Sequence, residues 1–98
     1  MSKEEFTEEQ LKTLKNVEGL LHGMLGDRSV PRNIKRVAQQ GISIIHKGME
    51  SPQGMESPGI LASNVLYLVV DVSQDPNIPF ASRTTIYRII SLLETIRD

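Results

Sequence analysis

Hydrolytic, redox and metal chemistry depends on a few side chains that meet at one point, chiefly histidine, cysteine, aspartate and glutamate. The sequence contains two histidines, His22 and His46, and no cysteine. In an antiparallel hairpin that turns near Arg28, a rise of about 1.5 Å per residue puts the histidines ~9 Å and ~27 Å from the turn. They are then too far apart to share an ion, so we expect no metal site.

Known catalytic and cofactor-binding motifs are also missing from the sequence. It has no Gly-x-Ser-x-Gly elbow, no phosphate-binding loop and no dinucleotide fingerprint. The lack of cysteine excludes thiolate zinc sites, cysteine nucleophiles and disulfides, and it fits a reducing cytoplasm. A chain of 98 residues also leaves little room for a deep cavity. We therefore expect no catalytic residue, no cofactor and no enzymatic activity.

Four cations fall within nine residues of a chain whose formal net charge is only -1: Arg28, Arg32, Lys35 and Arg36. They surround the start of a predicted helix, whose dipole also favours anions, so one hypothesis is a patch for the phosphates of RNA. Four cations without interleaved aromatic residues predict weak binding that depends steeply on salt.

The alternative for this region is structural. Asp27 and Asp75 each begin a turn that ends in proline, and an aspartate in such a turn accepts hydrogen bonds from nearby backbone amides. Each carboxylate could also form an ion pair with a cation of the helix that follows it. For Asp27 the candidate cations are Lys35 and Arg36. We prefer this interpretation, which assigns a turn-forming role to five residues: Asp27, Pro31, Asp75, Pro79 and Arg83.

The aromatic residues are few, and we expect Tyr67 and Tyr87 to belong to the core or its rim rather than to a stacking platform. Phe80 follows Pro79 at the corner of the second turn, where the first turn has Arg32. Core packing is the favoured interpretation for Phe80 as well. The alternative is an exposed anchor for a protein partner or for a second copy of the chain.

Apolar residues recur at helical spacing in four segments, so we predict helices over residues 7–25, 31–47, 58–74 and 79–97. Thr7 and Gln10 form a capping-box pattern, and a proline stands at the start of each later segment. The third segment is rich in valine and leucine and resembles a strand, but a lone strand would have no partner. We therefore predict a helix there too.

Glycines and a duplication interrupt these segments. Gly19 and Gly23 lie inside the first helix at a cost of about 1 kcal/mol each relative to alanine. Either another backbone packs closely against them or the helix is weakened. The hexapeptide Gly-Met-Glu-Ser-Pro-Gln at residues 48–53 is almost repeated at 54–59. We predict a single domain over residues 1–98, with a flexible N-terminus at 1–6 and a flexible linker between hairpins at 48–57.

The chain contains an internal repeat with an offset of 48 residues, which pairs Asp27 with Asp75, Pro31 with Pro79 and Lys35 with Arg83. Each unit has the plan helix, Asp-x-x-(Val/Ile)-Pro turn, helix, which is similar to helical repeats of the HEAT type. Two such units can close on each other and bury both apolar faces.

The sequence blocks resemble a small archaeal protein family of no established function. The resemblance rests on residues 27–36, 75–79, Arg83 with Thr84, and 91–94. Two features depart from the family pattern: the linker is longer by one hexapeptide, and Gly59, Ile60 and Leu61 replace an arginine and a run of alanines. The resemblance implies an all-helical, cytoplasmic archaeal protein and no assigned activity.

Together these observations predict an all-α fold, a four-helix bundle made of two HEAT-like antiparallel hairpins. The predicted function is a non-catalytic protein-interaction module whose partner is unknown and could be the protein itself. The alternative is a weak RNA- or ribonucleoprotein-associated factor that uses the basic patch. No apolar stretch approaches the ~20 residues of a membrane span, so we expect no membrane partner and a cytoplasmic location.

Overall fold

The computed structural model describes residues 6–50 and 57–97, and in these ranges it contains four α-helices and no strand. The helices are α1 (Glu8–Leu25), α2 (Arg32–Glu50), α3 (Pro58–Ser73) and α4 (Phe80–Leu93). The predicted all-α fold is confirmed. The predicted third helix is also confirmed, although its sequence resembles a strand.

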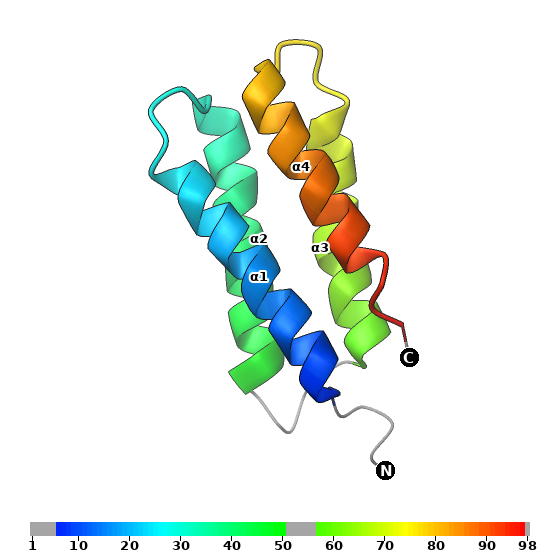
Figure 1. The fold of residues 1–98 in the computed structure, drawn as a ribbon. Coiled ribbons are helices and arrows are strands. Elements are labelled where there is room, and N and C mark those ends of the chain that lie inside the picture. Colours follow the sequence, from blue (N-terminus) through cyan, green and yellow to red (C-terminus); the bar gives the residue numbers. More distant parts are fainter. Residues whose placement is uncertain (1–5, 51–56, 98) are drawn as a thin grey trace.

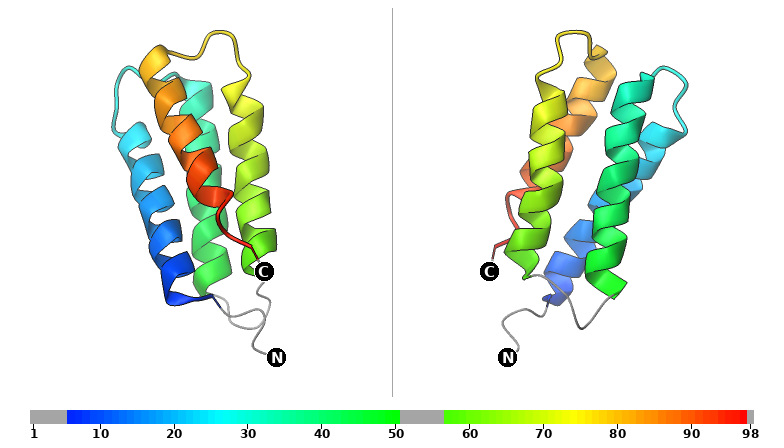
Figure 2. Two further views of the ribbon diagram at one scale, coloured as in Figure 1. Left: turned by 45° about the vertical axis from the view of Figure 1, so that its right-hand side comes forward. Right: turned by 180° about the vertical axis from the view of Figure 1, so that it is seen from behind.

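The four helices run alternately up and down and form an elongated bundle of 44 × 20 × 19 Å (Figure 1). Each helix packs against two neighbours, in the cyclic order α1, α2, α3, α4 and back to α1. Figure 2 shows that the α1–α2 and α3–α4 turns lie at the same end of the bundle. The two predicted hairpins therefore pack side by side, and their turns form one end surface.

The helix starts follow from local hydrogen bonds. The Thr7 hydroxyl accepts from the Gln10 backbone N–H at 3.0 Å, and the Gln10 side chain accepts from the Thr7 N–H at 2.9 Å, which completes the predicted capping box. The Ser57 hydroxyl caps α3 by accepting from the Ile60 N–H. Pro79 precedes α4, which has no side-chain cap. No capping side chain therefore accepts a hydrogen bond from the first backbone N–H groups of α4.

The last helix is shorter than predicted because the chain turns after Leu93. The Thr95 hydroxyl donates to the Leu92 carbonyl at 2.7 Å, and this turn buries Ile96 against the core. The Gln10 side-chain amide donates to the Arg97 carbonyl at 2.8 Å. The spacing of apolar residues could not show that the helix ends before Ile96. Ile96 would face the core in a continued helix, just as it does in this turn.

One continuous core fills the bundle, and it contains the apolar faces that the helical spacing predicts. All four helices contribute side chains that are 0–1% exposed. In α3 the side chains of Leu66, Leu68 and Val70 are half-buried in addition to the fully buried ones, so this helix is apolar on more than one side. No helix within the described ranges is long and apolar enough to cross a membrane. The largest fully buried side chains are Leu14, Val17, Ile34, Ile45, Pro58, Leu61, Val65, Ile86, Ile89 and Leu93.

The structure corrects the start of the predicted linker at residues 48–57. Helix α2 continues to Glu50, so Gly48 is a helical residue. A Cβ atom at Gly48 would lie 2.7 Å from Leu61 Cδ1, so any other residue there would force the Leu61 side chain to shift. The rest of the linker prediction, residues 51–56, and most of the predicted flexible N-terminus lie outside the described residues.

Candidate interaction site

The first turn is built around Asp27. Its Oδ1 atom accepts hydrogen bonds from the Ser29 hydroxyl at 2.7 Å and the Ser29 backbone N–H at 2.9 Å. These two bonds, the hydroxyl first, lower the pKa of Asp27, with a smaller contribution from the positive charge of Lys35. The Val30 N–H then donates to the Asp27 carbonyl, and Pro31 leads into α2. The carboxylate is thus committed to closing the turn.

The second turn repeats this geometry around Asp75. Its Oδ1 atom accepts from the Asn77 N–H at 2.9 Å, and the Ile78 N–H donates to the Asp75 carbonyl. The Arg83 guanidinium donates to the backbone carbonyl of Asp75 at 3.3 Å rather than to its carboxylate. The predicted pair between Asp75 and Arg83 is therefore replaced by a contact with the backbone carbonyl of Asp75, whereas Lys35 acts on Asp27 through its charge.

A hydrogen bond that the sequence did not predict joins the two turns. The side-chain amide of Asn33, in the first turn of α2, donates to Asp75 Oδ2 at 3.0 Å. The internal repeat contained one indication that Asn33 has a special role: Asn33 is polar, whereas the equivalent residue of the second unit is Ala81. The partner could not be inferred without knowing how the hairpins pack. This bond fixes the two corners relative to each other.

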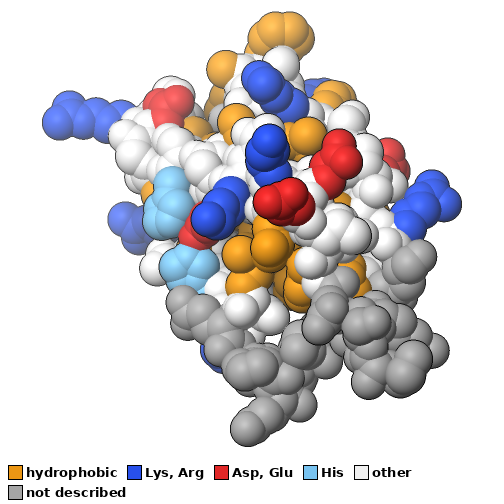
Figure 3. Space-filling view, turned by 60° about the horizontal axis from the view of Figure 1, so that its bottom comes forward, with side chains coloured by type: hydrophobic (Ala, Val, Ile, Leu, Met, Phe, Trp, Pro, Cys, Tyr) orange, Lys and Arg blue, Asp and Glu red, His pale blue; other side chains and the backbone are white. Residues whose placement is uncertain are grey.

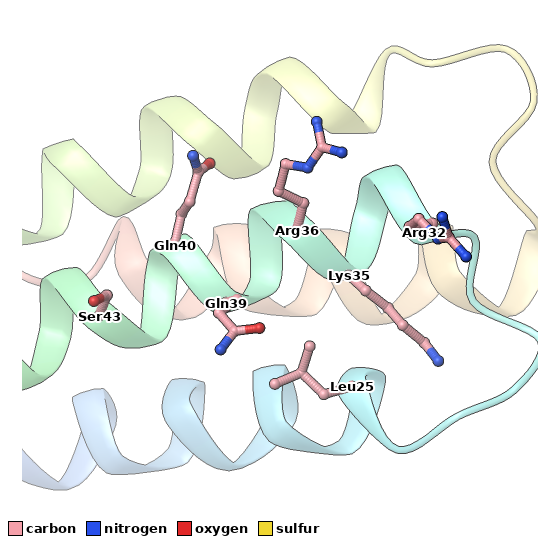
Figure 4. A pocket seen from close by; sticks show the side chains of 7 residues that line it. All are labelled: Leu25, Arg32, Lys35, Arg36, Gln39, Gln40 and Ser43. Atoms are coloured by element: carbon pink, nitrogen blue, oxygen red, sulfur yellow. The ribbon is translucent and has the colours of Figure 1, made fainter.

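Three of the four predicted patch cations line a shallow groove of about 700 Å³ along α2 (Figure 4). In Figure 4 the Lys35 side chain extends toward α1 and the Arg36 side chain toward α3, so the cations spread across the groove. Arg28 is exposed in the turn and does not line the groove. No acidic residue belongs to the lining, which comprises Leu25, Arg32, Lys35, Arg36, Gln39, Gln40 and Ser43.

The aromatic side chains of the second hairpin are exposed, so the core interpretation of Phe80 is wrong. Phe80 is 86% exposed, Tyr67 80% and Tyr87 52%. Phe80 precedes the buried Ile89 by nine residues, which turns it half a revolution away from the core at 100° per residue. Tyr87 lies on the same outer face of α4, seven residues after Phe80. Tyr67 lies on the outer side of α3.

The two histidines approach one carboxylate. His46 hydrogen-bonds to Glu18 Oε2 across the α1–α2 interface, and His22 Nε2 lies 4.0 Å from the same oxygen. Both histidines appear on one face in Figure 3, coloured pale blue. The rise per residue did not predict this approach. It gives the position of each backbone along the helix axis and takes no account of how far the side chains extend. Among the described residues, no three His, Cys, Asp or Glu side chains are arranged to hold a metal ion.

The chain is similar to archaeal proteins of one family. The model of the uncharacterised protein family UPF0147 matches residues 1–96. A UPF0147 protein of Desulfurococcus amylolyticus is 36% identical over 85 residues, which cover 87% of each chain. A UPF0147 protein of Metallosphaera sedula is 40% identical over 79 residues, which cover 81% of this chain and 82% of the relative.

Two solved structures share the fold. The crystal structure of the unknown function protein MMP1188 superposes with a TM-score of 0.76 at 32% identity and covers 90% of this chain and 93% of that one. A protein from Thermoplasma acidophilum, from uncharacterised family UPF0147, gives a TM-score of 0.74 at 31% identity, with 88% and 94% coverage.

Proposed function

Because the chain belongs to the uncharacterised protein family UPF0147, which brings no activity with it, we propose from its own surface that it is a non-catalytic protein-interaction module. Its contact surface is the outer face of α4, with Phe80 as the anchor. The observation that carries this proposal is the 86% exposure of Phe80. A large apolar side chain left in water at a rigid corner gains the most by packing into a partner.

The rigidity of the corner supports an anchoring role. Phe80 follows Pro79, whose ring fixes one backbone dihedral angle, and the preceding turn is closed by Asp75. The bond from Asn33 to Asp75 ties this turn to the other hairpin. A preorganised aromatic side chain loses little conformational entropy on binding, so more of its burial energy contributes to affinity. Tyr87 extends the same face by two helical turns.

The HEAT-like character of the hairpins and a cytoplasmic location belong to the same proposal. The matching hydrogen bonds of the two turns support a repeat, as does the burial of Val30 and Ile78, at 6% and 7% exposure, at equivalent positions. The absence of cysteine supports a reducing compartment. Paired helices offer rigid surfaces for binding, which fits an adaptor better than an enzyme.

To test this, the wild-type chain and the Phe80→Ala variant are each immobilised and incubated with an extract of the source organism. The amount of partner protein that each one captures is then compared. We expect a stoichiometric partner whose capture falls at least about tenfold for Phe80→Ala, since a buried aromatic anchor is worth 2 kcal/mol or more. Tyr67→Ala is the matched control, because it removes an exposed aromatic ring from another face and should leave capture unchanged. Equal capture by Phe80→Ala and the wild type would refute the anchor.

A second candidate function is weak association with RNA, favoured by the basic groove on α2. Its lining contains three cations, neutral hydrogen-bonding side chains and no acid. Arginine and lysine neutralise phosphates, and amide side chains can donate to phosphate or base edges. Few cations take part, so binding would be weak and would decline steeply with salt.

Retention on an RNA column at low salt tests this candidate. The quadruple alanine variant of Arg28, Arg32, Lys35 and Arg36 should elute at markedly lower salt than the wild type. A control with the same change in net charge replaces Lys12, Lys15, Arg88 and Arg97, which lie away from the groove. If both variants elute together, retention follows net charge alone and the groove has no special role.

A further inference from the structure

The basic groove on α2 has an uneven distribution of charge along its length. Its cations, Arg32, Lys35 and Arg36, occupy the first part of the groove, next to the α1–α2 turn. The rest of the α2 lining is neutral and comprises Gln39, Gln40 and Ser43. At about 1.5 Å per residue, the cations lie within ~6 Å along the helix axis, and the neutral part continues for a further ~10 Å. The groove therefore has a charged end and an uncharged end that can form hydrogen bonds.

Two rows of side chains connect the charged end to the neutral end. In Figure 4, Arg36 and Gln40 extend toward α3, whereas Lys35 and Gln39 extend toward α1. In each row a cation is followed four residues later by an amide, and residues four apart are neighbours on a helix surface. A ligand that contacts a cation of the groove therefore has an amide side chain within reach on either side of α2.

The arginines and glutamines of the groove are exposed and available to a ligand. Elsewhere, the side-chain amides of Gln10 and Asn33 hydrogen-bond to other segments of the chain. Among the described residues, the groove arginines and glutamines make no hydrogen bond or ion pair with their side chains. Lys35 differs, because it interacts with the charge of Asp27. The folded chain thus leaves most of the polar groups of the groove unused.

The shape of the groove favours part of a longer chain over a small molecule. The groove holds about 700 Å³, but it is shallow and lies on the surface of α2 (Figure 4). Sites for small molecules are concave and bury most of the ligand. A polymer needs no such enclosure, because it continues beyond the site and makes further contacts with the surface.

The two ends of the groove match the two parts of a nucleotide. A nucleotide combines an anionic phosphate with a neutral base, whose edge carries hydrogen-bond donors and acceptors. The charged end of the groove suits the phosphate, and the amides at the neutral end suit the base and the 2′-hydroxyl of RNA. An acidic polypeptide would use the cations but not this division between charged and neutral ends.

The small extent of the charged end favours one strand over two. In an RNA duplex the major groove is too deep and narrow for side chains to read, so proteins contact phosphates and 2′-hydroxyls across the wide minor groove. Cations that lie within ~6 Å along one helix instead reach neighbouring phosphates of one strand. The amides also require unpaired bases, because base pairing occupies the Watson–Crick edges.

We propose that the groove binds single-stranded RNA. Phosphates lie at the groove arginines, and unpaired bases and 2′-hydroxyls hydrogen-bond to Gln39 and Gln40. Lys35 contributes less than the arginines, because the negative charge of Asp27 offsets part of its attraction for phosphate. This inference rests on the second candidate function, RNA association, and adds the form of the RNA and the residues that contact its bases.

Fluorescence anisotropy with a labelled single-stranded RNA of about ten nucleotides tests the proposal. The wild-type chain is titrated against this strand, against its duplex with the complementary strand and against DNA of the same sequence. Each titration is repeated between about 50 and 200 mM salt. We expect the single-stranded RNA to bind at least about fivefold more tightly than the duplex or the DNA.

A double arginine variant tests the charged end. Arg32→Ala with Arg36→Ala should weaken binding to every nucleic acid and reduce the slope of log affinity against log salt by about 1, because each phosphate contact contributes ~0.7. Arg88→Ala with Arg97→Ala is the matched control, since it removes the same charge outside the groove lining. This control should keep the wild-type slope.

A double glutamine variant tests the neutral end. Gln39→Ala with Gln40→Ala should lower the affinity for single-stranded RNA at least about fivefold and leave the salt slope unchanged. Asn16→Ala, which removes an exposed amide of α1 outside the groove lining, should bind like the wild type. Alanine favours a helix, so these variants should fold, and circular dichroism checks this.

Different results refute the inference and the function on which it rests. If the wild-type chain binds no nucleic acid, or if the two arginine pairs act alike, RNA association fails and the inference fails with it. If only the groove arginines weaken binding, but the duplex or the DNA binds as tightly as single-stranded RNA, the inference alone is wrong. It is also wrong if the glutamine variant binds like Asn16→Ala, or if polyglutamate of equal charge displaces the RNA.

Discussion

Replacement of Ile89 by alanine is expected to lower the free energy of unfolding by about 2–5 kcal/mol. The Ile89 side chain is 0% exposed in the second half of α4, within the core that all four helices share. Alanine removes buried apolar surface and leaves a cavity that a close-packed bundle cannot fully close. A domain of this size has about 5–15 kcal/mol of stability in total, so a large part would be lost.

Urea denaturation followed by circular dichroism at 222 nm measures this loss as a lower midpoint with an unchanged slope. Tyr87→Ala is the control, because Tyr87 lies in the same helix two residues earlier and is 52% exposed. Its effect should stay within about 0.5 kcal/mol. If Ile89→Ala cost no more than this control, Ile89 would not be in a packed core.

The same substitution at two glycines is expected to act in opposite directions. Gly19→Ala should raise the free energy of unfolding by about 0.5–1 kcal/mol, because alanine favours the helix and its Cβ meets no atom within 4 Å. Gly48→Ala has the same helical preference, but its Cβ would lie 2.7 and 2.8 Å from the two Cδ atoms of Leu61. Leu61 is 1% exposed, so a shift of its side chain has to be accommodated inside the core.

The difference between the two variants isolates the steric cost, since the gain in helix propensity is common to both. We expect Gly48→Ala to be less stable than Gly19→Ala by about 1–3 kcal/mol, the usual cost of an overpacked core. Thermal unfolding of both purified variants beside the wild type measures it. Equal stability would show that α2 and α3 do not approach closely at Gly48.

Local chemistry in the sequence was sufficient to predict where the four helices begin, although α2 continues past its predicted end and α4 stops before it. The capping box at Thr7, the proline at the start of α3 and the spacing of apolar residues each depend on neighbours within one helical turn or two. The Asp27 and Asp75 turns are local in the same way. These features are encoded by a few adjacent residues, so no knowledge of packing is needed to find them.

Features that depend on packing between hairpins were not predictable in this way. Gly48 looks like part of a linker because it begins a Pro- and Gly-containing duplication, and only the contact with Leu61 reveals its role. The partner of Asn33 is 42 residues away in sequence. The position of Phe80 was predictable in part, since helical phase turns it away from Ile89, but its hydrophobic character suggested the core.

The hydrogen bond from Gln10 to Arg97 has a consequence for the order of folding. It joins residues 87 positions apart, across the seam between the first and last helices. The other three helix contacts join consecutive segments, so they close shorter loops and lose less chain entropy. The hairpins can therefore form early, and α1 meets α4 late.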